Sequence, residues 1–141
     1  MDMKQLINGT IIGGAALFLT GYVIFDLLAG DFYAANITAA GLIRDPQELW
    51  ATAAGNFLMA LLITIGIVNS AGPNNMVSGM KTGAIYACLV WVSADLTLYG
   101  YLNLTTLNLV AADAVLELVH GGIAGALIAI ALAKLSKPAT E

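Results

Sequence analysis

Four long apolar segments dominate this sequence of 141 residues, and no other feature limits the fold as strongly. They cover about residues 6–30, 46–69, 79–101 and 109–135. Each is long enough to cross the roughly 30 Å hydrocarbon core of a bilayer as a helix, which takes about 20 residues. Backbone groups in lipid must find partners within their own segment, so these runs predict helices and not barrel strands. We therefore predict a single-domain, all-α membrane protein whose four transmembrane helices form an antiparallel up-down bundle.

The composition supports a chain that has lipid as part of its solvent. Hydrophobic residues make up 60% of the sequence, charged residues 10%, and the mean hydropathy is +0.87. Soluble domains average about 25% charged residues, so this chain cannot cover a water-facing surface. The net charge of −4 and the scattered basic residues indicate no nucleic-acid partner. The single Cys88 excludes an intramolecular disulfide and a CxxC pair.

Basic residues between the apolar segments predict the orientation in the membrane. With four spans, both termini lie on the same side as the second loop. That side carries Lys4, Lys81, Lys134 and Lys137, whereas the other side carries Arg44. Since Lys and Arg accumulate in cytoplasmic loops, we expect the N and C termini to be cytoplasmic. The first apolar segment exceeds the apolar core of a signal peptide, so we expect it to remain as a span.

Two further features help to place the segments. Asp45, Pro46 and Glu48 form a helix-start pattern, with an N-cap, a proline at the first helical position and a capping-box glutamate. They predict that the second helix begins at Pro46. The longest loop, residues 31–45, carries aromatic side chains such as Tyr33. We expect this loop to lie at the outer membrane interface.

Small residues recur one helical turn apart on three of the four segments. They are Gly9 with Gly13, Gly79 with Gly83, and Gly121 with Gly125. Close backbone contact at such faces is a main source of helix association in lipid. Two interpretations stay open: packing within one four-helix bundle, or contact with a second copy or another membrane protein.

Polar residues inside the spans mark the candidate site. Inserting one carboxylate near the centre of a span costs about 2.5–3.5 kcal/mol, so such residues usually face the bundle interior or a wet cavity. Asp113, Glu117 and His120 are spaced i, i+4 and i+7, which places them on one helix face. The full predicted set for binding a ligand, proton or cation is Asp26, Asn56, Asp95, Asp113, Glu117 and His120, with Tyr22 and Tyr99 one turn from acids.

Lys81 and Lys134 lie at the ends of their spans, and no Lys or Arg lies deeper in a span to neutralise these acids. They must therefore be protonated, bind a metal or monovalent cation, or open onto water at the outer surface. Glu117 and His120 have the Glu-x-x-His spacing of a di-iron bundle, but that architecture needs a second such motif and two further glutamates. We predict no metal site and no other cofactor. Known catalytic motifs such as HExxH and GxSxG are missing from the sequence, so we expect no enzyme.

Several stretches are similar to a known group of proteins. They are residues 21–28 (GYVIFDLL), 31–36 (DFYAAN), 49–50 (LW), 55–56 (GN) and 81–84 (KTGA), with the Ala- and Gly-rich final segment. In these the chain resembles an uncharacterised bacterial family of small four-helix inner-membrane proteins. The resemblance implies a multi-pass protein of the cell inner (plasma) membrane. It implies no activity and no catalytic residue.

Two hypotheses for function follow from the sequence. In the first, an outward-facing polar and acidic pocket binds or moves a small ligand, proton or cation. In the second, the chain is a non-catalytic accessory or self-assembling subunit of a membrane complex. The small-residue faces would then carry the function, and the acids would form hydrogen bonds between helices.

Overall fold

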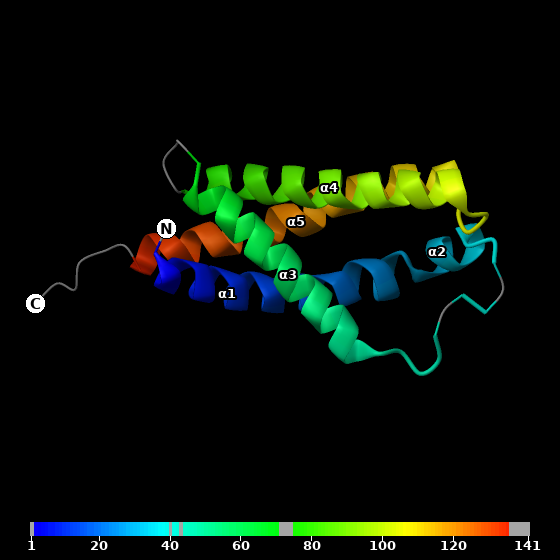
Figure 1. Cartoon of the computed structure of the whole chain (residues 1–141), viewed down its shortest axis with the longest axis horizontal. Coiled ribbons are helices and arrows are strands. Elements are labelled where there is room, and N and C mark those ends of the chain that lie inside the picture. The colour runs from blue at the N-terminus through cyan, green and yellow to red at the C-terminus, as the bar shows by residue number, and fades with distance from the viewer. Residues whose placement is uncertain (1, 40, 43, 71–74, 136–141) are drawn as a thin grey trace, which may run out of the picture.

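A computed structural model describes residues 2–39, 41–42, 44–70 and 75–135. Within these ranges all regular structure is helical, in five α-helices and one π-helical segment. In chain order they are α1 (Met3–Gly21), η1 (Tyr22–Leu28), α2 (Gly30–Asn36), α3 (Leu49–Val68), α4 (Met76–Tyr101) and α5 (Leu107–Leu135). Figure 1 shows these helices side by side along the long axis, with α3 crossing the others obliquely.

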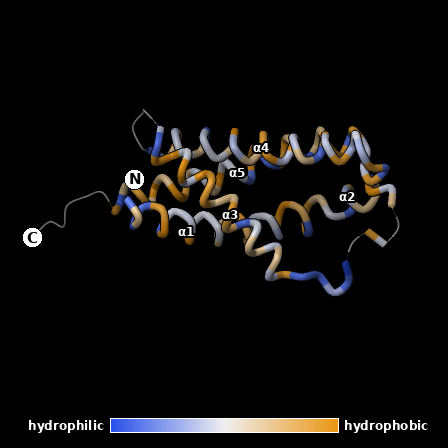
Figure 2. The backbone as a smooth tube through the Cα atoms, in the orientation of Figure 1, coloured by the Kyte–Doolittle hydropathy of each residue, from blue (hydrophilic) through white to orange (hydrophobic). Residues whose placement is uncertain are grey.

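Four helices are long and apolar enough to cross a membrane. They are α1 continued by η1 (Met3–Leu28), then α3, α4 and α5, with 26, 20, 26 and 29 residues. At 1.5 Å per residue, even 20 residues reach about 30 Å. Hydrophobic residues follow the long helices along their length, while the segment leading into α3 is hydrophilic (Figure 2). The prediction of an all-helical chain with four apolar helices of membrane-spanning length is confirmed, and it supports a multi-pass membrane protein.

The helix α5 forms the centre of the bundle. It contacts α1, α2, α3 and α4. In its most apolar stretch 56% of the residues are buried, against 22% in α1, 22% in α3 and 11% in α4. The other long helices therefore present most of their apolar side chains outward, as expected of helices whose outer surface faces acyl chains.

Glycine allows α4 and α5 to approach at backbone distance. A methyl group on Gly83 would collide with the carbonyl oxygen of Gly121, and one on Gly79 with the carbonyl oxygen of Gly125. In lipid such contact gains dispersion energy that larger side chains would prevent. The four α4 and α5 glycines predicted to pack helices thus lie against each other within one chain.

The two remaining predicted packing glycines lie where α1 meets α3 and α5. Gly9 packs against the Thr64 side chain of α3, and Gly13 packs against Ile128 and Ala60. Next to these contacts is the apolar core. It is made of Leu17, Ala60, Ile63, Ile67, Ala124, Ile128 and Leu132.

The start of α3 differs from the sequence prediction. The helix begins at Leu49 and not at Pro46, and Glu48 in the N-cap position makes no side-chain capping bond. Instead, the Glu48 carboxylate accepts a hydrogen bond from the Trp50 indole at 2.8 Å, and it lies 3.9 Å from the Arg44 guanidinium. Because Trp50 and Arg44 interact with the Glu48 carboxylate, this carboxylate does not form the capping box that the sequence predicted.

Two predicted features fall outside the described residues. Lys137, one of the basic residues used to predict orientation, is not among them. Part of the loop before α4 also lies outside, but the α4 start itself is clear, because the Asn75 side chain caps the helix by accepting from the Ser78 N–H at 2.9 Å.

Candidate functional site

Three acidic or basic side chains of α5 are buried along one face of the helix. Asp113, Glu117 and His120 are 6%, 3% and 5% exposed. Their i, i+4, i+7 spacing turns all three toward the interior, because residues at these intervals share a helix face. The Asp113 end of this row faces α2, and the His120 end adjoins the apolar core.

His120 connects α5 to α1. Its Nε2 lies 2.9 Å from the backbone carbonyl oxygen of Leu17, and its Nδ1 lies 3.2 Å from Glu117 Oε2. A carbonyl oxygen only accepts, so Nε2 carries the hydrogen and donates it. One further proton then lies between Nδ1 and the Glu117 carboxyl group. Whichever of the two groups holds it, the Glu117–His120 pair as a whole is neutral.

The geometry of α1 makes room for the imidazole ring. A Cβ atom on Gly21 would lie 3.4 Å from His120 Nε2, so the ring lies directly against the backbone of α1 at this glycine. One turn further, the Phe25 ring packs edge-on against the His120 ring, with centroids 5.3 Å apart. Phe25 lies in η1, where the Ala29 N–H bonds to the Ile24 carbonyl oxygen in the wider π-helical pattern. Such segments are frequent at functional sites.

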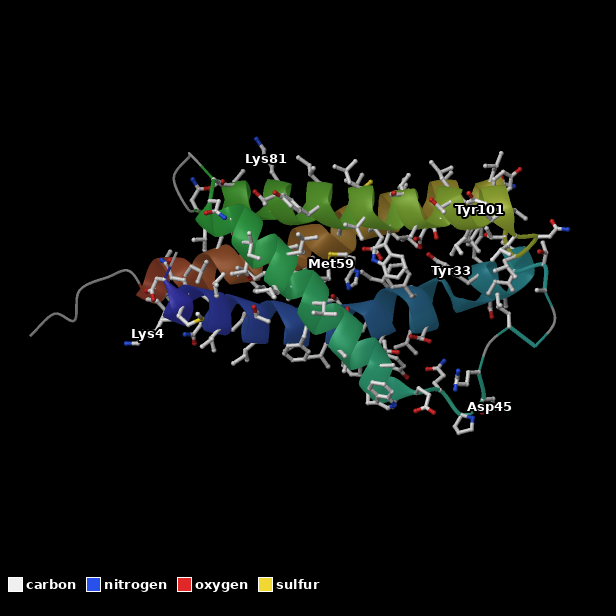
Figure 3. The ribbon with its side chains drawn as sticks, viewed as in Figure 1. Lys4, Tyr33, Asp45, Met59, Lys81 and Tyr101 are labelled. Atoms are coloured by element: carbon white, nitrogen blue, oxygen red, sulfur yellow. The ribbon has the colours of Figure 1, made fainter. Side chains whose placement is uncertain are left out.

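Tyr33 of α2 closes the opposite end of the cluster. Its hydroxyl donates a hydrogen bond to Asp113 Oδ1. Its ring packs edge-on against Phe25 with a centroid distance of 5.8 Å. Figure 3 shows the labelled Tyr33 side chain extending from α2 back toward the long helices. Burial, followed by the hydrogen bond and the charge of Asp113, raises the pKa of the Tyr33 hydroxyl well above its usual value.

Hydrogen bonds between two loops hold α2 in this position. The Thr38 N–H and hydroxyl donate to the carbonyl oxygens of Leu104 and Asn103, at 3.1 and 2.7 Å. The Thr106 hydroxyl donates to Asn36 Oδ1 at 2.8 Å. The segment after α2 is therefore tied to the α4–α5 connection, which keeps Tyr33 next to Asp113.

Asp95 brings α4 into the site. It is partly buried, and its carboxyl group is within reach of a side-chain hydrogen bond with Asp113. Two carboxyl groups can form such a bond only when one of them carries a proton. Asp95 Oδ2 is buried and has no hydrogen-bond partner among the described residues. The Asp95–Asp113 pair thus retains a carboxyl oxygen that can accept a hydrogen bond.

Four of the predicted site residues lie apart from this cluster. Asp26, Tyr22 and Tyr99 are exposed on the outside of the bundle. Asn56 is partly buried, but its amide donates to the Thr52 carbonyl oxygen of its own helix at 2.9 Å. The structure thus brings together Asp95, Asp113, Glu117 and His120 from the predicted set. We name these four with Tyr33 the acid cluster.

Sequence reasoning missed Tyr33, Phe25 and the Leu17 carbonyl. A signal for Phe25 was present, because Gly9, Gly13, Leu17, Gly21 and Phe25 follow each other at intervals of four. This row marks the face of the first span that packs inward, and Asp26 lies off it. For Tyr33 the only signal was its place in a loop expected at the membrane interface. The Leu17 carbonyl carried no signal, because every residue has one.

The chemistry of the cluster favours a single positive charge over a multivalent metal. Within the described ranges no three His, Cys, Asp or Glu side chains are arranged to hold a metal ion. The Glu117–His120 pair is neutral, and if Asp95 and Asp113 share one proton, that pair carries one negative charge. One more proton, or one monovalent cation, would make the whole cluster neutral.

The fold and site together define a helical, multi-pass membrane protein with a buried acid cluster. Comparisons with protein-family models, with curated proteins and with solved structures find no match to this chain.

Proposed function

We propose that this chain is a non-enzymatic membrane protein that binds one proton, or one monovalent cation in its place, at the Asp95–Asp113 pair. The observation that carries the proposal is the burial of this acid cluster inside apolar helices without a Lys or Arg partner. Of the basic residues described, Arg44 pairs with Glu48 on the surface, and Lys4, Lys81 and Lys134 are exposed. An uncompensated charge in such surroundings is costly, so a bound cation or proton stabilises the folded protein.

The surroundings of the cluster favour entry from the α2 side. Beyond His120, toward the start of α1, the bundle is filled by Leu17, Ile63, Ile67 and Ile128, each at most 1% exposed. Thr64 is the buried polar side chain among them, and its hydroxyl already donates to the Ala60 carbonyl oxygen of its own helix, so this packing offers ions and water few partners. The cluster would therefore exchange its proton or cation with the compartment that α2 faces.

For the arrangement in the membrane we propose an antiparallel up-down bundle with cytoplasmic termini, in the inner (plasma) membrane. The contacts between α4 and α5 support opposite directions, because Gly79 meets Ala129 whereas Ala87 meets Gly121. The basic residues at the α3–α4 end support its cytoplasmic location. The α2 side would then be the outer side. The likeness to the small bacterial inner-membrane family is part of this proposal.

The alternative, an accessory or self-assembling subunit, has weaker support. All six glycines of the small-residue motifs are occupied by contacts inside the chain. A second copy or partner would have to bind the outward apolar faces, of which α4 has the largest share. The mass of the purified protein in mild detergent tests this alternative directly.

Infrared spectroscopy tests the binding proposal, because a protonated carboxyl group has its own C=O absorption. We expect the parent protein to show a carboxyl band that titrates with pH and is lost in Asp113→Asn. Asp26→Asn, which changes an exposed acid near the same end of the bundle, is the matched control and should leave the band unchanged. Repeating the titration with added Na⁺ distinguishes a cation from a proton, since a cation that competes with the proton shifts the pH at which the carboxyl band changes. A band that persists in Asp113→Asn and Asp95→Asn would rule out the proposed site.

A further inference from the structure

A groove opens between α3 and α4 at the end of the bundle opposite the acid cluster. Its volume is about 440 Å³. Its lining includes Ile65 and Asn69 of the α3 side and Ser78, Lys81, Thr82 and Ile85 of α4. A neighbouring hollow of about 480 Å³ along the first turns of α4 shares Ser78 and Lys81 with it. Figure 1 shows that α3 ends beside the start of α4 here, near the start of α1. We call this feature the α3–α4 groove.

The walls of the groove change from polar to apolar with depth. Near the helix ends the lining side chains are Asn69, Lys81 and Thr82. One turn deeper they are Ile65 of α3 and Ile85 of α4. A phospholipid has the same division, with a polar headgroup at the interface and acyl chains below it. The groove lies on the bundle surface, where lipid has direct access.

The mouth of the groove favours negative charge. Lys81 is exposed and forms no ion pair with another described residue. Figure 3 shows its side chain extending outward from α4. The partial positive charge at the start of the 26-residue α4 acts in the same direction. Basic pockets between transmembrane helices on the cytoplasmic side are a known way to bind anionic lipid headgroups.

From this geometry we propose that the α3–α4 groove binds an anionic phospholipid, with its phosphate at Lys81 and an acyl chain along Ile65 and Ile85. This inference does not depend on the acid cluster. A zwitterionic lipid fits the same shape, but its ammonium group offsets the attraction to Lys81. The groove should therefore select by charge.

Native mass spectrometry of the full chain in detergent tests the proposal with phosphatidylglycerol and phosphatidylcholine of identical acyl chains. We expect the parent to bind phosphatidylglycerol about five-fold more tightly, as one lysine near a membrane surface contributes about 1 kcal/mol. Lys81→Gln should reduce this preference to about two-fold or less, and Lys81→Arg should restore it. Lys134→Gln, which removes an exposed lysine at the same end but outside the groove, should leave the preference unchanged.

Three outcomes would overturn the assignment. Equal binding of both lipids by the parent would remove charge selection. An equal loss in Lys134→Gln and Lys81→Gln would indicate a general surface potential and not a groove. Displacement of phosphatidylglycerol by inorganic phosphate would indicate a site for free anions in which the acyl chain has no part. Because Lys81 is exposed, Lys81→Gln should fold, and an unchanged unfolding temperature verifies this.

Discussion

Single hydrogen bonds decide the charge of the site. His120 Nε2 has a carbonyl oxygen as its partner, so the ring's second nitrogen must share a proton with Glu117. This leaves the pair neutral, and the proposed function therefore assigns the exchangeable charge to Asp95 and Asp113. Tyr33 also contributes to the site, since its hydroxyl donates a hydrogen bond to Asp113 and occupies one acceptor position of that carboxylate. In the proposed function, these five side chains from three helices hold one exchangeable charge.

Tyr33 gives a prediction at this scale, because its pKa is raised by burial and by the Asp113 carboxylate. An ordinary tyrosine loses its proton near pH 10. In the folded parent, the tyrosinate absorbance that develops near this pH should equal that of Tyr33→Phe, since Tyr33 does not contribute to it. In denaturant the tyrosinate absorbance of the parent should exceed that of Tyr33→Phe by the contribution of one tyrosine. A smaller folded-state absorbance in Tyr33→Phe would contradict the hydrogen bond to Asp113.

The same raised pKa has a consequence for stability. Tyr33 contributes its full stabilisation below about pH 10, the unfolded value, and this is lost as the pH rises toward the higher folded value. The difference in unfolding free energy between the parent and Tyr33→Phe should therefore shrink in alkaline solution.

At the scale of helices, α5 and α4 form the closest pair in the bundle, and α1 contacts α5 through Leu17 and Gly13. The short α2 then positions Tyr33 across from Asp113. The α4–α5 pairing matters for the site, because it sets the distance between Asp95 on one helix and Asp113 on the other. A change that separates these helices should disturb the acid cluster from a distance.

Gly83→Ala tests this dependence. A methyl group there would collide with the Gly121 carbonyl oxygen, and overpacking of this kind costs about 1–3 kcal/mol. Gly100→Ala on the same helix is the matched control, because its new methyl group meets no atom within 4 Å. We expect Gly83→Ala to unfold at lower denaturant concentration than the parent and Gly100→Ala to match or exceed the parent. If both variants behave alike, Gly83 does not lie in close contact with α5.

The sequence predicted the helices well because lipid demands length and hydrophobicity, and both can be counted. It also predicted the shared face of Asp113, Glu117 and His120, since helical spacing fixes that face. It did not place Asp26 outside the bundle, because hydrophobicity alone does not distinguish the faces of that span, and the four-residue row from Gly9 to Phe25 is the one mark of its inner face. Asn56 was equally ambiguous, as its own helix satisfies its amide. The role of Tyr33 depends on how α2 turns back, which loop hydrogen bonds decide.

As a whole, the described interior carries ionisable side chains at one end and is mainly aliphatic at the other, where Thr64 is the buried polar residue. The acid cluster reaches from Tyr33 to His120, and packed aliphatic side chains around Leu17 and Ile63 follow. The α3–α4 groove at the far end lies on the surface, and none of the acid-cluster residues lines it. This division favours a site that exchanges with one compartment over a pathway across the membrane.

Proton flux into liposomes tests that division. A proton at His120 would have to cross the packing of Leu17, Ile63 and Ile128, where the hydroxyl of the buried Thr64 is engaged with its own helix, and this barrier should block passive flux. We expect parent, Asp95→Asn and Glu117→Gln liposomes to leak protons at the same rate under an imposed pH gradient, although Asp95→Asn loses the carboxyl titration seen by infrared. The comparison of both readouts in one variant separates binding from transport. Faster flux in the parent than in Glu117→Gln would show that the apolar packing opens, and the protein would then be a transporter of the charge it binds.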